Sequence, residues 1–204
     1  DSINLSSEAI NAAQSVIKEK YGKEYLPSSP RIYKSKSKNT QEAHEAIRPA
    51  GSSFTSPETL KSSLTDVEYK LYDMIWKRTV ASQMTAANIE QTRLEISDGQ
   101  HIFVANGKTI LFPGFLRAYV EGSDNPNDML DDMEKTLPKV NKGQEVQWDE
   151  ISPKQHFTKP ISRFTEASLV KELESLGIGR PSTYATIMQN IQFKGYVNKV
   201  KGAM

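Results

Sequence analysis

The 204-residue sequence contains no cysteine and only three histidines, which are widely separated at positions 44, 101 and 156. The absence of cysteine excludes disulfides, thiolate zinc sites and cysteine nucleophiles, and it agrees with a reducing compartment such as the cytoplasm. No apolar run approaches the roughly 20 residues of a membrane helix, and the first residues lack the basic and apolar regions of a secretory signal. We therefore expect neither a membrane protein nor a secreted one.

Aromatic residues are also scarce, at 8% of the chain, whereas hydrophobic residues make up 37% and charged residues 25%. This composition lies slightly to the polar side of an ordinary folded domain. A chain of this length is sufficient for one full domain or for two to three small ones, each with a core of its own. Full disorder is not expected.

The net charge is only +1, but the charges are segregated along the chain. Residues 18–48 carry eight basic and four acidic side chains, residues 121–150 carry three basic and nine acidic ones, and residues 152–204 carry eight basic and three acidic ones. Two basic regions around an acidic one suggest surfaces that grip a polyanion from two sides. Solvated faces that happen to segregate are the alternative.

The first 84 residues are expected to be mainly helical. Ser6 is placed as the N-cap of a helix that Gly22 ends, and residues 23–39 are expected to form an exposed basic loop. Thr65 and Glu68 match a capping box that starts a longer helix, which should run to about residue 84. Its expected buried stripe consists of Val67, Leu71 and Ile75.

A short helix is predicted between these two, because Asn39 and Glu42 also resemble a capping box. It would place His44 and Arg48 four residues apart on one helix face, ending at Pro49. An imidazole and a guanidinium so arranged could hold a phosphodiester, although a histidine on a short helix is more often structural.

From residue 86 the hydrophobic period changes to two, which indicates β-strands. One strand is expected around residues 92–97, with a turn at Asp98-Gly99 and a second strand at 102–105. Asn106-Gly107 predicts a second hairpin turn, and Val146 with Trp148 suggests a further strand. Residues 122–137 are expected to form an acidic loop and residues 153–160 a linker.

The last region again has a helical period. Thr165 is placed to cap one helix, and a second helix begins after the glycine-containing turn at 177–181 and ends at Gly195. Two short helices joined in this way resemble a helix-turn-helix.

The start of the second helix is the clearest candidate anion site. Arg180, Ser182 and Thr183 would place a guanidinium, two hydroxyls and free backbone N–H groups around one helix N-terminus, which favours a phosphate. Arg163 repeats this arrangement before the preceding helix. The alternative is that Ser182 and Thr183 only cap the helix while Arg180 pairs with Glu174. The sequence contains no P-loop, no G-x-S-x-G, no H-E-x-x-H and no paired-carboxylate motif.

Two stretches of the sequence resemble type IA DNA topoisomerases, the bacterial ones above all. They are Ala-His-Glu-Ala-Ile-Arg-Pro at 43–49, and Arg-Phe-Thr-Glu-Ala-Ser-Leu-Val-Lys at 163–171 continuing through Gly-Ile-Gly-Arg-Pro-Ser-Thr-Tyr-Ala at 177–185. The Asp-Ser start also looks like the end of the family's Tyr-x-Arg-Thr-Asp-Ser active-site segment. The nucleophilic tyrosine and the acidic TOPRIM domain are not in the sequence, which therefore looks like an internal fragment, inactive by itself.

The resemblance implies an isomerase that relaxes negatively supercoiled DNA without ATP. The tyrosine attacks a phosphodiester of single-stranded DNA and forms a 5′-phosphotyrosine, another strand passes, and the break is resealed. Mg²⁺ held by the TOPRIM domain assists, so the implied cofactor site lies outside these residues, which themselves should bind none. The expected partners are single-stranded and negatively supercoiled DNA and the remaining segments of the same enzyme.

The resemblance also implies a mixed α and β, multi-domain fragment. Residues 1–84 would be the rest of the helical, tyrosine-bearing domain, residues 85–157 half of an antiparallel β-rich arch that hinges the gate, and residues 158–204 the start of a helical domain that binds the single strand. His44 and Arg48 would face the active-site phosphate. The implied DNA contacts are Arg163, Thr165, Ser168, Arg180, Ser182 and Thr183. A freestanding helix-turn-helix DNA-binding protein, and a module that docks a partner through residues 122–137, remain as alternatives.

Overall fold

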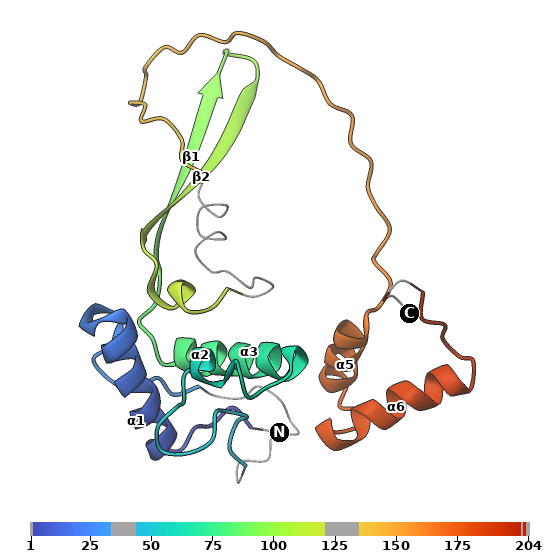
Figure 1. Ribbon diagram of the computed structural model, residues 1–204. Helices are drawn as coiled ribbons and strands as arrows, with labels where there is room; N and C mark the ends of the chain where they lie inside the picture. The colour runs from blue at the N-terminus through green and yellow to red at the C-terminus, as the bar shows by residue number, and fades with distance from the viewer. Residues whose placement is uncertain (1, 34–43, 121–134, 201, 203–204) are drawn as a thin grey trace. The chain divides into compact units, whose positions relative to one another are not determined.

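The computed structural model of this chain describes residues 2–33, 44–120, 135–200 and 202 (Figure 1). The chain divides into two compact units. We call residues 4–33 and 46–141 the helix–hairpin unit, and residues 2–3, 44–45 and 142–202 the C-terminal unit, in both cases as far as they are described. Within the described residues no helix is both long and apolar enough to cross a membrane.

The first helix, α1 (Ser7–Val16), begins where the sequence predicts. The hydroxyl of Ser6 accepts a hydrogen bond from the N–H of Ala9 at 3.2 Å, so the N-cap is confirmed. A π-helical turn, Ile17–Tyr21, extends the helix to Gly22, which has a φ of 107°. A side chain at this φ would be strained, and the glycine therefore allows the chain to leave the helix.

The longest helix, α3 (Asp66–Ser82), follows the short α2 (Pro57–Leu60). Thr65 and Glu68 form the predicted capping box, in which the backbone N–H of Thr65 donates to the Glu68 carboxylate at 2.9 Å. The predicted buried stripe is wrong at two of its three positions, because only Ile75 is half-buried. Val67 is 77% exposed and Leu71 is 54% exposed.

The helix instead buries the face that carries Trp76 and Val80, which pack in one core with the small residues of α1. That face was obscured in the sequence because it also contains polar residues such as Thr79 and Gln83, both of which are buried. Periodicity identifies an apolar stripe on a helix, but the neighbouring elements decide which stripe is covered.

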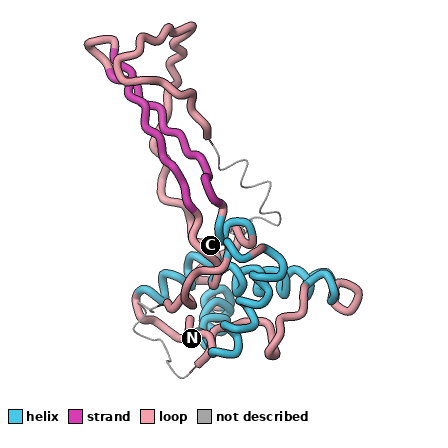
Figure 2. Tube along the Cα trace, turned by 90° about the vertical axis from the view of Figure 1, so that its left-hand side faces the viewer, coloured by secondary structure: helices cyan, strands magenta, loops and turns pink. Residues whose placement is uncertain are grey.

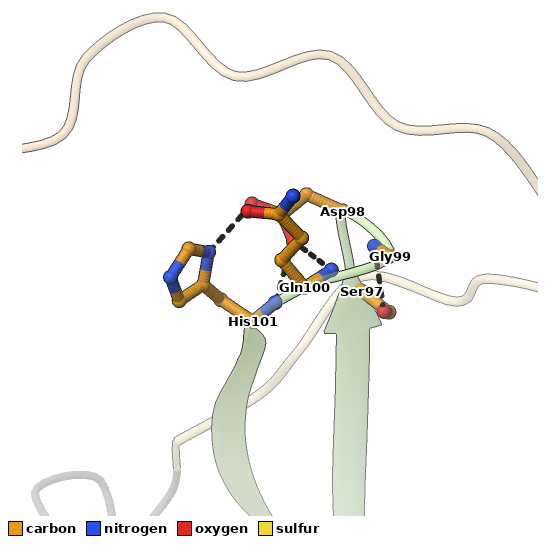
Figure 3. Close-up of polar contacts among 5 residues, drawn as sticks. All are labelled: Ser97, Asp98, Gly99, Gln100 and His101. Atoms are coloured by element: carbon orange, nitrogen blue, oxygen red, sulfur yellow. Dashed lines mark hydrogen bonds and ion pairs between the residues drawn. The ribbon is translucent and has the colours of Figure 1, made fainter.

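A long antiparallel hairpin, β1 (Asn88–Ser97) and β2 (Ile102–Phe112), projects from the helices of this unit (Figure 2). The predicted turn at Asp98-Gly99 is confirmed. One carboxylate oxygen of Asp98 accepts hydrogen bonds from the N–H groups of Gln100 and His101, and the other lies 3.1 Å from Nδ1 of His101 (Figure 3). These hydrogen bonds lower the pKa of Asp98 below its usual value.

The predicted turn at Asn106-Gly107 is wrong, because β2 continues through both residues and Gly107 pairs with Thr92. Residues 135–137 cross the strand at this point, and Lys108 and Lys135 exchange two backbone hydrogen bonds of 2.9 Å. A Cβ atom on Gly107 would lie 2.8 Å from the carbonyl oxygen of Lys135 and 2.7 Å from Cγ of Leu137. Glycine is therefore required here because the backbone of residues 135–137 comes so close, and not because the chain turns.

The base of the hairpin is tied to the helices by hydrogen bonds and an aromatic contact. The N–H of Thr85 donates to the carbonyl of Tyr25, and the N–H of Phe115 donates to the carbonyl of Thr85, both at 2.9 Å. The rings of Tyr25 and Phe112 lie 4.9 Å apart. At Gly114 a Cβ would meet the carbonyl of Ala86 at 2.5 Å, so the two ends of the hairpin cross in close contact.

The C-terminal unit contains two helices, α5 (Glu166–Ser175) and α6 (Pro181–Phe193), as the sequence predicts. Between them the N–H of Ile178 donates to the carbonyl of Leu173 at 2.8 Å, and Gly177 has a φ of 71°. The predicted strand at Val146 and Trp148 is wrong, because both lie in an irregular segment where Trp148 is 74% exposed. The expected linker at 153–160 is likewise irregular and exposed.

Candidate nucleic-acid interface

The start of α5 carries three of the predicted contact residues: Arg163, Thr165 and Ser168. The hydroxyl of Thr165 accepts from the N–H of Ser168 at 3.1 Å, and the hydroxyl of Ser168 accepts from the N–H of Thr165 at 2.8 Å. Both hydroxyls therefore form a capping box that stabilises the helix start. Arg163 is exposed, and its guanidinium makes no hydrogen bond or ion pair within the described part of the chain.

The start of α6 is built in a similar way. The hydroxyl of Thr183 accepts from the N–H of Arg180 at 2.8 Å and donates to the Arg180 carbonyl at 2.9 Å. Ser182 is exposed and its hydroxyl has no partner among the described residues. The alternative in which Arg180 pairs with Glu174 is not what the structure contains, because the ion pairs of the described residues do not include it.

The backbone before α6 is fixed against the helix. Gly179 has a φ of 76°, and a Cβ there would lie 2.8 Å from Cδ1 of Ile187 and 3.2 Å from the Thr183 hydroxyl. This close packing sets the position of Arg180, the next residue. Each of the two helix starts thus combines an exposed guanidinium with the positive end of a helix dipole, an arrangement that suits an anion.

The predicted short helix at 39–48 is wrong in its described part, because residues 44–49 are not helical. Asn39 and Glu42, its expected cap residues, lie outside the described residues. The N–H of Ala46 donates to the carbonyl of Asn4 at 2.7 Å, so this backbone group is paired with the start of the chain and not within a helix. Arg48 precedes Pro49, which is fully buried, and a residue before proline is disfavoured in the helical region.

His44 is exposed and belongs to the C-terminal unit, whereas Arg48 is half-buried and belongs to the helix–hairpin unit. The guanidinium of Arg48 donates to the carbonyls of Pro49 and Gly51, at 2.9 and 3.0 Å. One guanidinium nitrogen of Arg48 therefore holds its own loop. Because residues 44–48 are not helical, His44 and Arg48 do not share the helix face on which the predicted phosphodiester site was based.

One buried side chain, at the end of α3, was not singled out from the sequence. Gln83 is 1% exposed, and its amide bonds both backbone groups of Arg31: Oε1 accepts from the N–H at 3.1 Å, and Nε2 donates to the carbonyl at 3.0 Å. The hydroxyl of Tyr33 donates to the carbonyl of Ser82 at 2.6 Å. The end of α3 thus holds residues 31–33, which belong to the basic loop expected at 23–39. A glutamine after a helix gives no sequence signal for such a role.

A second polar cluster, around Glu58 of α2, lies beside the π-helical turn that follows α1. The carboxylate of Glu58 accepts from Nζ of Lys20 at 2.8 Å and from the hydroxyl of Ser56. These two hydrogen bonds lower the pKa of Glu58 to about 2. Burial, with the nearby charges of Glu58 and Asp73, raises the pKa of Tyr21 to about 12. Neither group has a geometry that implies catalysis.

Within the described ranges, no group of three or more histidine, aspartate or glutamate side chains is arranged to hold a metal ion.

The comparisons with known proteins agree on one family. The family model described as DNA topoisomerase matches residues 1–204. DNA topoisomerase 1 of Streptomyces coelicolor is 52% identical over 98% of this chain, and that of Mycolicibacterium smegmatis is 50% identical over all of it. The solved structure of full-length topoisomerase I from Thermotoga maritima covers all of this chain with a TM-score of 0.72 and 32% identity.

The chain spans 21% and 22% of the length of these two curated relatives and 31% of the Thermotoga chain. The mixed α and β fold with its two-stranded antiparallel sheet is thus similar to part of topoisomerase I.

Proposed function

Because this chain belongs to the DNA topoisomerase family, and to its bacterial type IA members, we propose that it supplies DNA-gate and single-strand-binding surfaces to such an enzyme. The whole enzyme would relax negatively supercoiled DNA by transient cleavage of one strand. The nucleophilic tyrosine and the acidic residues that hold Mg²⁺ are assigned to segments outside these 204 residues. The residues of this chain would therefore bind and position the strand, and the chain alone would not cleave DNA.

The observation that carries the proposal is the pair of exposed arginines at the starts of α5 and α6. Arg163 and Arg180 each stand beside a helix N-terminus, and neither guanidinium has a partner in the described residues. A guanidinium that is not neutralised by the protein is available for a phosphate, which it can hold through two parallel hydrogen bonds. Two such positions in succession suit two phosphates of one strand.

The hydroxyls take different parts in this proposal. Thr165, Ser168 and Thr183 are engaged in capping, so they would fix the helix starts and reach a phosphate only as secondary donors. Ser182 has an uncommitted hydroxyl and would donate directly. His44 and Arg48 would lie near the phosphate that the tyrosine attacks, with Arg48 acting through the loop it holds.

The three regions would have separate roles. Residues 1–84 would complete the helical domain that carries the tyrosine, residues 85–157 would be half of the arch that opens the gate, and residues 158–204 would begin the helical domain that binds the single strand. The acidic residues of the middle region suit a hinge that does not hold phosphates.

The proposal is tested by fluorescence anisotropy of the chain with a labelled single-stranded oligonucleotide and with a matched duplex, at two salt concentrations. We expect preference for the single strand, affinity that falls with salt, and weaker binding by the Arg163→Ala/Arg180→Ala variant. Loss of two phosphate contacts should also reduce the salt dependence: at about 0.7 per contact on a single strand, the slope of log affinity against log salt should fall by roughly 1.4.

The matched control is Lys70→Ala/Arg93→Ala, which removes the same charge from exposed positions of the helix–hairpin unit. Circular dichroism verifies the fold of each variant. Equal losses in both double variants would mean that only net charge matters, and would contradict the assignment to Arg163 and Arg180. Tighter binding of the duplex than of the single strand would favour the freestanding helix-turn-helix alternative.

A further inference from the structure

One face of α6 is an exposed stripe that ends in a phenylalanine. Successive helical residues are about 100° apart, so Ser182, Thr186, Gln189 and Phe193 lie within a narrow arc of the helix surface. All four are exposed, and Phe193 is 92% exposed. The opposite face is buried or half-buried and consists of Tyr184, Ile187, Met188 and Ile191. The ring of Phe193 therefore contributes almost nothing to the core of the C-terminal unit.

The surroundings of this stripe favour an anionic occupant. Residues 175–204 include no aspartate or glutamate and four basic residues. Lys194 follows Phe193, and its Nζ lies 6.0 Å from the ring of Tyr196, which is itself 73% exposed. Lys199 forms an ion pair with Glu166. Lys194 and Arg180 have no acidic partner among the described residues.

The chemistry of the stripe fits a nucleic acid single strand better than an acidic peptide. Exposed aromatic rings beside basic side chains form stacking platforms for unpaired bases, whose flat faces are free only in a single strand. The intervening side chains of Thr186 and Gln189 are uncharged hydrogen-bonding groups, which tolerate any base. No apolar row accompanies Phe193 along the stripe, as a groove for an amphipathic helix would require.

The length of the stripe sets the spacing of the contacts. Ser182 and Phe193 are eleven residues apart, or about 16 Å along the helix axis at 1.5 Å per residue. A stacked strand rises about 3.4 Å per nucleotide, so this distance corresponds to at most about five nucleotides, and to fewer in a more extended strand.

We propose that Phe193 is a base-stacking residue: a single strand held by its phosphate at Arg180 and Ser182 runs along α6, and an unpaired base about three to five nucleotides away stacks on the Phe193 ring. This inference rests on the proposed function, because it takes the phosphate site at the start of α6 as its other end. It adds a contact with a base to contacts that are otherwise with phosphates.

The test measures the affinity of the 204-residue chain for single-stranded oligonucleotides in which one abasic residue is placed at successive positions. Phe193→Ala should weaken binding of the intact strand about tenfold, a loss of 1.4 kcal/mol that lies within the range for base stacking on an aromatic ring. This penalty should vanish for the one oligonucleotide whose abasic residue lies at the stacking position. Phe193→Trp should retain the affinity, whereas Phe193→Leu should lose it.

Leu176→Ala is the matched control, because it removes an apolar side chain that is 63% exposed in the same unit but outside α6. An unchanged affinity of Phe193→Ala, while Arg163→Ala/Arg180→Ala binds more weakly, would overturn the stacking inference and leave the proposed function standing. A penalty of equal size for every abasic placement would also overturn it. No effect of either variant would overturn both proposals.

Discussion

Replacing the buried amide of Gln83 tests whether its hydrogen bonds to the backbone of Arg31 stabilise the helix–hairpin unit. Gln83→Leu keeps a side chain of similar size but removes both hydrogen bonds to the backbone of Arg31, at 3.1 and 3.0 Å. Each bond contributes about 1 kcal/mol, and each half-buried backbone group left without a partner costs roughly a further 1 kcal/mol. The better burial of leucine offsets part of this sum. We therefore expect the free energy of unfolding of the helix–hairpin unit to fall by about 2–3 kcal/mol.

Urea unfolding followed by tryptophan fluorescence measures this loss. Trp76 is 2% exposed and lies in the same core, whereas Trp148 is 74% exposed in the other unit, so a Trp148→Phe background makes the signal specific. With an m-value of about 2 kcal/mol/M, the midpoint should fall by about 1–1.5 M with m unchanged. The control is Gln91→Leu, on the exposed surface of β1. If Gln83→Leu shifts the midpoint no more than this control, the two hydrogen bonds between Gln83 and Arg31 make no net contribution to stability, and the reasoning is wrong.

Three further outcomes follow from the same unit. Lys20→Met should raise the pKa of Glu58 from about 2 toward its usual value in an NMR titration. Because the pKa of Glu58 is lowered in the folded protein, its contribution to stability is present above about pH 4.5 and is lost as the pH falls toward 2. Tyr21 should ionise only near pH 12 in an ultraviolet titration, and a Tyr21→Phe variant should lack this ionisation step. Because the pKa of Tyr21 is raised in the folded protein, its contribution to stability is present below about pH 10 and is lost as the pH rises through 12. Gly107→Val should lower the urea midpoint through a clash with Leu137 that costs roughly 1–3 kcal/mol, although valine favours strands; a higher midpoint would show that the crossing segment moves away freely.

The sequence by itself determined the features that depend on residues three or four positions apart. The helix starts at Ser6, Thr65 and Thr165 were predicted correctly, as was the hairpin turn at Asp98-Gly99. In each of them a side chain bonds to backbone groups of its immediate neighbours, so the signal lies within a short stretch of sequence. The residues of the proposed phosphate sites were chosen in the same way, as charged and hydroxyl residues at predicted helix starts, and their contacts with DNA stay a prediction.

Only the tertiary structure decided features that join distant parts of the chain. The buried face of α3 is selected by the small residues of α1, and Gly107 is explained by the passage of residues 135–137 rather than by a turn. Residues 44–48 are not helical, and the N–H of Ala46 donates to the carbonyl of Asn4, more than 40 positions earlier. Such contacts override local propensity because burial and paired backbone groups contribute more free energy than the preference of a short segment for helix or turn.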